Sequence, residues 1–359
     1  MTTIGILGGG QLGRMLAEAA QPLGLKTLCY ETYPDCSASH RSDIFVGDFT
    51  DNKALQNFAR QVDLVTFETE NLPIAAAKTI TEICPLYPAL QSLKTTQDRL
   101  FEKMLFTELE IPTNQYQAVN SLEDLHSYSQ AIGFPCVLKV RRTGYDGKGQ
   151  AVIRSIDDVA SAWDQLKGQE LLLESFVDFD KECSILAVRD RAGNVAFYPL
   201  TKNTHDKGVL RFSQAPFDAP QLTETLQHAA TKVLEKLNHV GMLAIEFFVQ
   251  GDNAIANEIA PRVHNSGHWT LDGAVTSQFE NHIRAIAGHE LGDTRAQGYS
   301  AMVNCIGDEH QRQAAEAISA CHYYSYDKSP RAGRKLAHIN IHDNDPSLVE
   351  KYLTQLLAH

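Results

Sequence analysis

The chain has 359 residues, and at about 150 residues per domain this length predicts two or three domains. Lysine and arginine number 32 against 44 aspartates and glutamates, a formal charge of −12 that argues against duplex nucleic acid or an anionic bilayer as the main partner. No long apolar run occurs, and residues 1–4 lack the basic start of a signal peptide, so we expect a cytoplasmic protein that binds neither nucleic acid nor membrane. The seven cysteines form no Cys-x-x-Cys pair, which favours reduced thiols.

Short apolar runs alternate with helical patterns over residues 1–90, which is typical of a parallel α/β layout. Around Pro85 and Pro88 this rhythm changes, and a helix-like stretch follows at 97–109. We therefore place a domain boundary near residue 98. The elements predicted before it are strands at 3–7, 27–30, 44–46 and 64–67, with helices at 11–22 and 53–61.

From residue 134 onward, predicted strands come in adjacent pairs with turn residues between them, which indicates an α+β segment built on antiparallel sheets. After Gly292 and Asp293 a short tail predicts a small third unit, so the predicted domains are 1–98, 99–293 and 294–359. The predicted strands are 136–140, 151–154, 171–176, 183–188, 195–200, 242–249, 254–259, 299–305 and 335–341, and the predicted helices are 159–166, 222–237 and 346–357.

A glycine-rich turn opens the chain. Residues 8–13, GGGQLG, follow a strand and begin a helix, and Glu31 lies at the end of the second strand, so the G-x-G-x-x-G pattern of dinucleotide-binding domains is matched. Glycines allow a tight turn and helix N-terminal amides favour an anion, but any phosphate would satisfy these needs. A purely structural turn is about as common, and a nicotinamide-dependent dehydrogenase stays open as the competing hypothesis.

A second glycine-rich stretch, residues 139–150, carries more chemistry. Lys139 ends an apolar strand, and the three glycines that follow make a loop whose amides can close over polyphosphate. Lys148, Arg141 and Arg142 add positive charge to an acidic chain. An exposed basic hairpin turn would explain the last Gly-Lys-Gly alone, but a lysine at the end of an apolar run is costly without an anionic partner. The spacing is not that of a P-loop.

Glu246 and Glu258 lie on two predicted strands separated by residues 251–253. If those three residues form the hairpin loop, Glu246 falls directly opposite Glu258 on one face of the sheet. Opposed like charges are unfavourable, but Mg²⁺ is commonly held by one or two carboxylates plus substrate phosphates. A register shift of one residue would instead place one glutamate on the solvent face. Both glutamates have apolar neighbours, so we predict a metal site.

The next segment, residues 260–269, is dense in polar side chains. His264 and His268 are four residues apart, but the proline and glycine in the segment argue against a helical pair that binds zinc. A loop that presents Arg262, His264 and Asn265 toward anions fits better.

Together these residues resemble the ATP-grasp superfamily, and within it the chain is similar to the family of N5-carboxyaminoimidazole ribonucleotide synthetases, also described as the ATPase subunit of phosphoribosylaminoimidazole carboxylase. The similarity runs nearly end to end. The His-Asn-Ser-Gly-His-Trp and late Gly-Arg-Lys segments are specific to this family, whereas the central glycine loop is common to the superfamily. The motifs are GGGQLGRML at 8–16, FETEN at 67–71, GYDGKGQ at 144–150, NEIAPR at 257–262, HNSGHW at 264–269, and GRK at 333–335 with HIN at 338–340.

The resemblance implies an N-terminal Rossmann-like domain with a parallel sheet, a central ATP-grasp fold and a small C-terminal domain, α/β and α+β in class. It also implies a homodimeric ligase of purine biosynthesis. The implied reaction carboxylates 5-aminoimidazole ribonucleotide with bicarbonate and ATP, through carboxyphosphate, and yields N5-carboxyaminoimidazole ribonucleotide, ADP and phosphate. Mg²⁺ is the implied metal ion, with Mn²⁺ as an alternative.

Residue roles follow from the same resemblance. Glu246 and Glu258 are expected to hold the metal. Arg262 is expected to bind the bicarbonate or carboxyphosphate, and Asp146 to accept a proton from the amine. Lys148 is expected to be catalytic together with Arg262 and Asp146. The implied ATP contacts are Arg99, Lys139, Gly144, Tyr145, Asp146, Gly147, Lys148, Gly149, Gln150, Glu174, Ser175, Phe176, Val177, Glu182, His205, Asn257 and Glu258. The implied ribonucleotide contacts are Gly10, Gln11, Leu12, Glu70, Tyr145, Lys148, His264, Asn265, Lys328 and Arg334.

The chain departs from the pattern at two positions. Val263 stands where the family usually has a second proline. Some superfamily members carry an asparagine two residues after the second metal glutamate, where this chain has Ala260, so a third protein ligand is not predicted. A second alternative function is a catalytically inactive regulator that binds ATP without phosphate release. Four retained residues argue against it together: Lys139, Glu246, Glu258 and Arg262.

Overall fold

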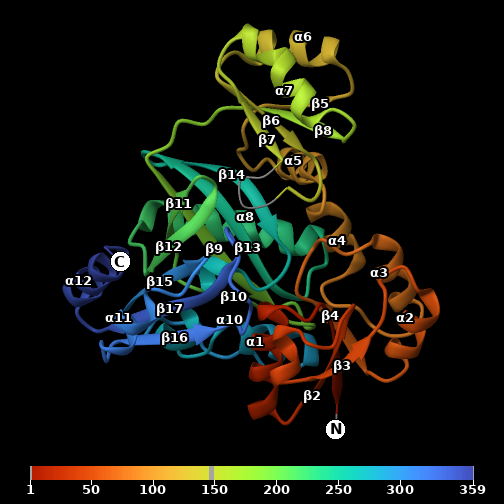
Figure 1. Cartoon of the computed structure of the whole chain (residues 1–359), viewed down its shortest axis with the longest axis vertical. Coiled ribbons are helices and arrows are strands. Elements are labelled where there is room, and N and C mark those ends of the chain that lie inside the picture. The colour runs from red at the N-terminus through yellow and green to blue at the C-terminus, as the bar shows by residue number, and fades with distance from the viewer. Residues whose placement is uncertain (1, 145–148, 359) are drawn as a thin grey trace.

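The structure is a computed structural model that describes residues 2–144 and 149–358. Its N-terminal part, red to orange in Figure 1, is a four-stranded parallel sheet in the order β3-β2-β1-β4, which confirms the Rossmann-like prediction. Helix α1 covers one face of this sheet, where Leu16 packs on Ile4, and α2 and α3 cover the other. The elements are β1 (Thr3–Leu7), α1 (Gln11–Ala20), β2 (Lys26–Glu31), β3 (Asp43–Val46), α2 (Asn52–Ala59), β4 (Leu64–Phe67) and α3 (Ile74–Thr81).

Two helices, α4 (Leu90–Thr96) and α5 (Arg99–Glu108), lead into a small antiparallel sheet with the order β5-β8-β6-β7. Helices α6 and α7 cover one face of this sheet at the top of Figure 1. Sequence analysis missed β5 and α6, although Ser121 caps α6 by accepting a hydrogen bond from the Asp124 amide. The elements are β5 (Tyr116–Val119), α6 (Leu122–Ile132), β6 (Cys136–Val140), β7 (Gln150–Ile153), α7 (Val159–Leu166) and β8 (Leu171–Ser175).

The rest of the chain builds one large antiparallel sheet in the order β14-β13-β9-β11-β12-β15-β17-β16, with β10 paired to β9. The C-terminal strands extend this sheet through the pairing of β12 with β15, while α11 and α12 pack over them in a separate apolar cluster. The elements are β9 (Lys181–Arg189), β10 (Val195–Phe197), β11 (Thr201–Asp206), β12 (Val209–Ala215), α8 (Pro220–Lys236), β13 (Gly241–Gln250), β14 (Asn253–Ala260), α9 (Thr270–Gly273), α10 (Gln278–Ala287), β15 (Tyr299–Ile306), α11 (Arg312–Glu316), β16 (Cys321–Ser325), β17 (Lys335–Asp343) and α12 (Pro346–Leu357).

The hairpin of β11 and β12 was not predicted from the sequence. Strand β11 reads Thr-Lys-Asn-Thr-His-Asp and therefore lacks an apolar run, and its turn is made by Lys207 and Gly208, both with positive φ. Strand β11 lies in the middle of the large sheet, and its His205 contributes to the site described below. Within the described ranges, no helix is both long and apolar enough to cross a membrane.

Candidate active site

The residues that sequence analysis assigns to ATP come from the two antiparallel sheets. Lys139 on β6 and Glu174 on β8 lie on the face of the small sheet that is turned away from α6 and α7, because Leu138 and Val140 pack beneath those helices. Glu182, His205, Glu246 and Glu258 come from β9, β11, β13 and β14 of the large sheet.

Arg99, the first residue of α5, connects the two sheets. Its Nη1 lies 3.1 Å from Glu258 Oε2, and its Nη2 donates to the carbonyl of Gly144, 2.9 Å away, in the loop that follows β6. The same loop carries Tyr145, Asp146, Gly147 and Lys148, whose predicted roles lie outside the described residues. After them, the carbonyl of Gly149 accepts from the Val140 amide at 2.8 Å and Gln150 begins β7, so the loop starts and ends beside Lys139.

Glu246 and Glu258 face each other directly across β13 and β14, as predicted. The predicted three-residue hairpin loop is wrong, because Gln250 pairs with Asn253 and the loop has only two residues, with Gly251 at a φ of 58°. A bulge at Asn257 then adds one residue to β14 and restores the register of the two glutamates.

The two carboxyl groups differ in electrostatics. Burial and the facing Glu258 carboxylate raise the pKa of Glu246 to about 7. Burial also acts to raise the pKa of Glu258, but the Arg99 guanidinium outweighs this effect and holds that pKa below its usual value. The Glu258 side chain is 40% exposed, whereas that of Glu246 is 11% exposed. Glu258 is therefore the charged carboxylate that reaches toward incoming ligands.

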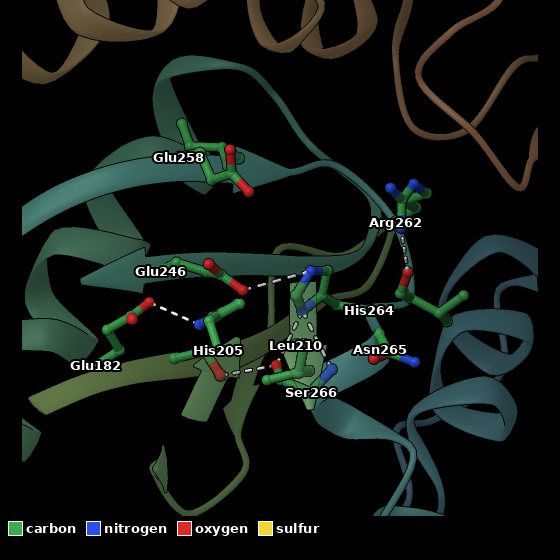
Figure 2. Close-up of polar contacts among 12 residues, drawn as sticks. Glu182, His205, Leu210, Glu246, Glu258, Arg262, His264, Asn265 and Ser266 are labelled. Carbon is green, nitrogen blue, oxygen red and sulfur yellow. Dashed lines mark hydrogen bonds and ion pairs between the residues drawn. The ribbon is translucent and has the colours of Figure 1, made fainter. Parts of the chain in front are cut away.

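Glu246 belongs to two groups of side chains that could hold a metal ion, one with Glu182 and His205 and one with Glu258. In Figure 2, Glu182, His205 and Glu246 point toward one another, and their ligand atoms lie within 4.8 Å of each other. His205 Nδ1 lies 2.7 Å from Glu182 Oε2, and this contact raises the pKa of His205 even though burial lowers it. Because His205 is already committed to Glu182, the two facing glutamates are the better pair for Mg²⁺, which prefers carboxylate oxygens.

Lys139 and Glu174 form an ion pair, with Lys139 Nζ 2.9 Å from Glu174 Oε2. Burial acts to raise the pKa of Glu174, but Lys139 and Lys103 hold it well below its usual value. The Glu174 side chain is almost fully buried and holds Lys139 in place. Ser175 ends β8, and Phe176, which is 48% exposed, and Val177 follow it. The contact of residues 174–177 with adenine stays a prediction.

Arg141 and Arg142 pair with acidic side chains. The sequence had suggested that their positive charge would help to bind phosphate. Arg141 Nη2 and Arg142 Nε both donate to Asp98 Oδ2, at 2.7 and 3.1 Å. Asp98 is fully buried and caps α5 through the Leu100 amide. These arginines therefore anchor the start of α5, and the prediction that they face phosphate is not supported by their geometry.

The glycine-rich turn at residues 8–13 is filled by the protein's own carboxylates. The amides of Gly10 and Gly13 donate to Glu68, each at 2.6 Å, and the amide of Gly9 donates to Glu31 at 2.9 Å. A Cβ at Gly10 would come within 2.6 Å of Glu68. The glycines thus make room for an internal carboxylate, and the amides that a dinucleotide phosphate would need are already occupied.

We therefore expect no saturable binding of NADH, because Glu31 and Glu68 block the phosphate position of a dinucleotide and would repel its charge. NADH fluorescence titrated against the protein measures this directly, with a fluorescent ATP analogue as the positive control. A saturable NADH signal in a protein that also binds the ATP analogue would restore the dehydrogenase hypothesis.

The predicted ribonucleotide side brings distant segments together. Lys328 donates from Nζ to Oε1 of Gln11, and burial lowers the pKa of Lys328 to about 8. Gly10 and Leu12 flank Gln11 on the same turn, with Leu12 packed against the apolar core. Arg334 donates to the Ser329 carbonyl at 3.2 Å on the tail that carries Lys328.

Arg262 and Glu70 form a two-pronged ion pair between the segment after β14 and the segment after β4. Arg262 Nη2 donates to Glu70 Oε1 at 3.0 Å and Nε donates to the other carboxylate oxygen, while Nη1 donates to the Val263 carbonyl at 3.0 Å. Three of the five guanidinium N–H groups are used in these contacts, which leaves two for an anion.

His264 and Asn265 differ in what they can do. His264 Nε2 lies 3.6 Å from Glu246 Oε1 and its Nδ1 is 2.9 Å from Ser266 Oγ, so the ring borders the glutamate pair (Figure 2). Burial and Arg262 lower the pKa of His264 to about 3, which keeps the ring neutral. The Asn265 amide is instead paired reciprocally with Asn304, at 3.1 and 2.6 Å, and so ties this loop to the C-terminal strands.

Sequence analysis missed Glu102 and Lys103, which are buried on α5 beside the bulge of β14. Burial raises the pKa of Glu102 to about 8 and lowers that of Lys103 to about 8. The signal was present in the predicted helix at 97–109, since Arg99, Glu102 and Lys103 share one helical face. The resemblance placed residues 68–71 at the ribonucleotide pocket, but the hydrogen bonds of Glu68 to the amides of Gly10 and Gly13 were not predicted, because only the folded sheet creates them.

Three family models match the chain. The ribonucleotide synthetase preATP-grasp domain matches residues 1–97, the ATP-grasp domain matches 104–279, and the phosphoribosylaminoimidazole carboxylase C-terminal domain matches 300–352. A Pseudomonas aeruginosa protein named N5-carboxyaminoimidazole ribonucleotide synthase is 44% identical over 355 residues, 99% of this chain and 98% of its own.

Solved structures agree with this. The N5-carboxyaminoimidazole ribonucleotide synthetase of Thermus thermophilus matches with a TM-score of 0.94 and 45% identity, over 98% of this chain and 97% of that one. The N5-carboxyaminoimidazole synthase of Aspergillus clavatus, solved with ADP and 5-aminoimidazole ribonucleotide, matches with a TM-score of 0.92 and 25% identity over 99% and 98% of the two chains. With sequence identity and fold both shared over nearly the whole length, this chain belongs to the N5-carboxyaminoimidazole ribonucleotide synthase family of ATP-grasp ligases.

Proposed function

We propose that this protein joins bicarbonate to the amine of 5-aminoimidazole ribonucleotide with the cleavage of ATP, and releases N5-carboxyaminoimidazole ribonucleotide, ADP and phosphate. The observation that carries this proposal is the facing pair of Glu246 and Glu258 beside Arg99, with the Arg262–Glu70 pair at the end of the same strand. Membership of the synthase family supports the choice of substrates.

ATP is proposed to lie between the two antiparallel sheets. Lys139 and Arg99 supply positive charge for its phosphates, Glu182 and His205 border the ribose, and residues 174–177 border the adenine. The loop that includes Gly144, Gly149 and Gln150 is proposed to close over the phosphates. Mg²⁺, or Mn²⁺, held by Glu246 and Glu258 and bordered by Asn257, would supply charge stabilisation to the transferring phosphoryl group.

Arg262 is proposed to hold bicarbonate through its two remaining N–H groups, while Glu70 keeps the guanidinium plane fixed. Bicarbonate is a poor electrophile, so the γ-phosphoryl group of ATP passes to one of its oxygens and gives carboxyphosphate plus ADP. The amine of the ribonucleotide then attacks the activated carbonyl carbon, directly or after release of carbon dioxide, phosphate leaves, and the amine gives up a proton. Asp146 is proposed to accept that proton, and loop closure excludes the water that would hydrolyse carboxyphosphate.

The ribonucleotide is proposed to lie between the N-terminal turn and the C-terminal tail. Lys328 and Arg334 supply charge for its phosphate, and Gln11 with its neighbours Gly10 and Leu12 forms the opposite wall. Tyr145 and Lys148 of the loop are proposed to contact the imidazole side, with His264 and Asn265 behind the glutamate pair. Asn265 acts here by holding the loop in place, as its pairing with Asn304 indicates.

Phosphate release measured with and without 5-aminoimidazole ribonucleotide tests the function. We expect release from ATP and bicarbonate to rise when the ribonucleotide is added, with one carboxylated product formed per phosphate. ATP binding without any ribonucleotide-stimulated release would contradict the proposal and favour an inactive regulator. We further propose a cytoplasmic homodimer, and light scattering during gel filtration would measure its mass.

Lys328 gives the site a predicted pH dependence. Its ammonium group must be charged to bind the phosphate of the ribonucleotide, and burial lowers its pKa to about 8. We therefore expect kcat/KM for the ribonucleotide to fall as the pH rises through about 8, since this ratio reports ionisation of the free enzyme. Lys328→Arg should move that fall to higher pH, because arginine stays charged. A profile that does not change in Lys328→Arg would assign the ionisation to another group.

A further inference from the structure

Strand β14 forms the edge of the large sheet at the metal site, and its free side is covered by α5 and the segment after it (Figure 1). The Ala256 amide donates to the Pro112 carbonyl at 2.7 Å, and the Thr113 hydroxyl donates to the Ala256 carbonyl at 2.8 Å. The edge is therefore not left to solvent at the point where β14 bends.

Three residues on one face of α5 contact β14 around this point. Glu102 Oε1 accepts from the Ile259 amide at 2.8 Å. Lys103 Nζ donates to the carbonyls of Ala256 at 3.2 Å and Asn257 at 3.0 Å. Arg99, one turn earlier, pairs with the carboxylate of Glu258. The helix thus binds the backbone on both sides of Glu258 and also its side chain.

These contacts enclose the bulge that sets the register of the two glutamates. A two-residue hairpin with regular pairing would place Asn257 opposite Glu246, and Glu258 would then turn to the other face of the sheet. The bulge at Asn257 prevents this, and bulges next to active sites commonly re-aim a side chain in this way. The carbonyls of Ala256 and Asn257 and the Ile259 amide are the backbone groups that would move if the bulge were lost.

We propose that Glu102 and Lys103 are positioning residues that hold the bulge of β14 and thereby keep Glu258 opposite Glu246. The inference rests on the proposed use of the two glutamates as metal ligands. Both act through the backbone of residues 256–259.

Lys103 has a second task that makes Glu102 the cleaner probe. Its Nζ also donates to Asn114 Oδ1 at 2.8 Å and lies 3.7 Å from Glu174, the partner of Lys139. Replacing Lys103 would therefore disturb both sheets. Within the described residues, the Glu102 side chain makes one hydrogen bond, which it accepts from the Ile259 amide of β14.

Mn²⁺ affinity in the presence of ADP, measured by electron paramagnetic resonance, tests the proposal without the ribonucleotide or bicarbonate. We expect Glu102→Ala to weaken Mn²⁺ binding about 10- to 100-fold, the usual effect of removing a group that orients a metal ligand. Glu102→Gln keeps an oxygen acceptor for the Ile259 amide and should restore the affinity to near that of the wild type. Wild-type affinity in Glu102→Ala, or equal loss in both variants, would overturn the proposal.

Amide hydrogen exchange supplies a readout that needs no metal. Glu102→Ala should speed exchange at Ile259, and Glu102→Gln should not. Asn281→Leu is the matched control for general loss of stability. Asn281 lies on α10, and the substitution removes the hydrogen bonds that its side-chain amide donates to the Tyr198 hydroxyl and the Gly292 carbonyl. If Asn281→Leu weakens Mn²⁺ binding as much as Glu102→Ala does, positioning is not the cause and the proposal fails.

These measurements separate two failures. A wild-type protein that binds Mn²⁺ and ADP but shows no ribonucleotide-stimulated phosphate release would contradict the proposed function and leave the positioning inference standing. A wild-type protein that binds no Mn²⁺ would contradict the metal assignment, and exchange at Ile259 would then decide alone whether Glu102 holds the bulge.

Discussion

Glu258→Gln is expected to abolish ATP turnover while the fold remains intact. The substitution removes the exposed, charged carboxylate of the facing pair. Removing a residue that only orients a metal ligand lowers activity by up to roughly 100-fold, so loss of a ligand itself should lower kcat by at least that factor. Stability should change little, because the glutamine relieves the repulsion with Glu246 while Arg99 loses one ion pair and keeps the Gly144 carbonyl. Magnesium-dependent phosphate release and the thermal midpoint measure the two effects.

Glu280→Gln is the matched control for this substitution. Glu280 is paired with Arg284 on α10, and neither is among the residues assigned to the site. This variant should keep wild-type turnover, since an ion pair between residues four apart on one helix contributes only about 0.3–0.5 kcal/mol. Near-normal phosphate release by Glu258→Gln under the same conditions would contradict the assignment of the metal site.

Arg262→Ala is expected to have the second large effect. Loss of the proposed bicarbonate donor should lower ribonucleotide-stimulated phosphate release about 10²- to 10³-fold, the size seen when one donor to a transition-state anion is removed. The substitution also leaves the Glu70 carboxylate without its partner, and we expect a loss of about 1–3 kcal/mol in the free energy of unfolding. Kinetics against bicarbonate and denaturant unfolding measure these changes.

Two further variants separate charge from geometry at this pair. Arg262→Lys keeps the charge but cannot make the two-pronged contact with Glu70, so it should recover stability better than activity. Arg284→Ala removes the guanidinium of the control pair on α10 and should leave kcat unchanged. ATP affinity should stay near the wild-type value in Arg262→Ala. If ATP affinity fell as far as kcat, Arg262 would belong to the nucleotide site and not to bicarbonate.

Most of the N-terminal sheet could be predicted from the sequence. Strands β1 and β4 were found with their observed bounds, and β2 and β3 within a residue at each end, because each is a short apolar run next to a helical pattern. Strand β11 could not be found in this way. All six of its side chains are polar, and His205 belongs to the site, so the sequence lacks the apolar signal on which strand prediction depends.

The position of Glu258 shows how a correct prediction can rest on an incorrect step. The expected three-residue loop and the observed two-residue loop differ by one residue, and the bulge at Asn257 compensates for that difference. Contacts from α5, about 150 residues earlier in the chain, surround this bulge. A local pattern in residues 242–259 cannot contain them.

The sequence by itself determined the parallel and antiparallel character of the sheets, the family, and the chemical groups available to the reaction, because these depend on residue types and short spacings. Only the tertiary structure decided which of those groups are free to bind ligands. The pairing of β4 with β1 brings Glu68 to the amides of residues 10 and 13 and so fills a turn that the sequence presents as a phosphate site. Asp98 likewise pairs with Arg141 and Arg142. The physical reason is that a buried charge must find its partner in three dimensions, and that partner lies far away along the chain.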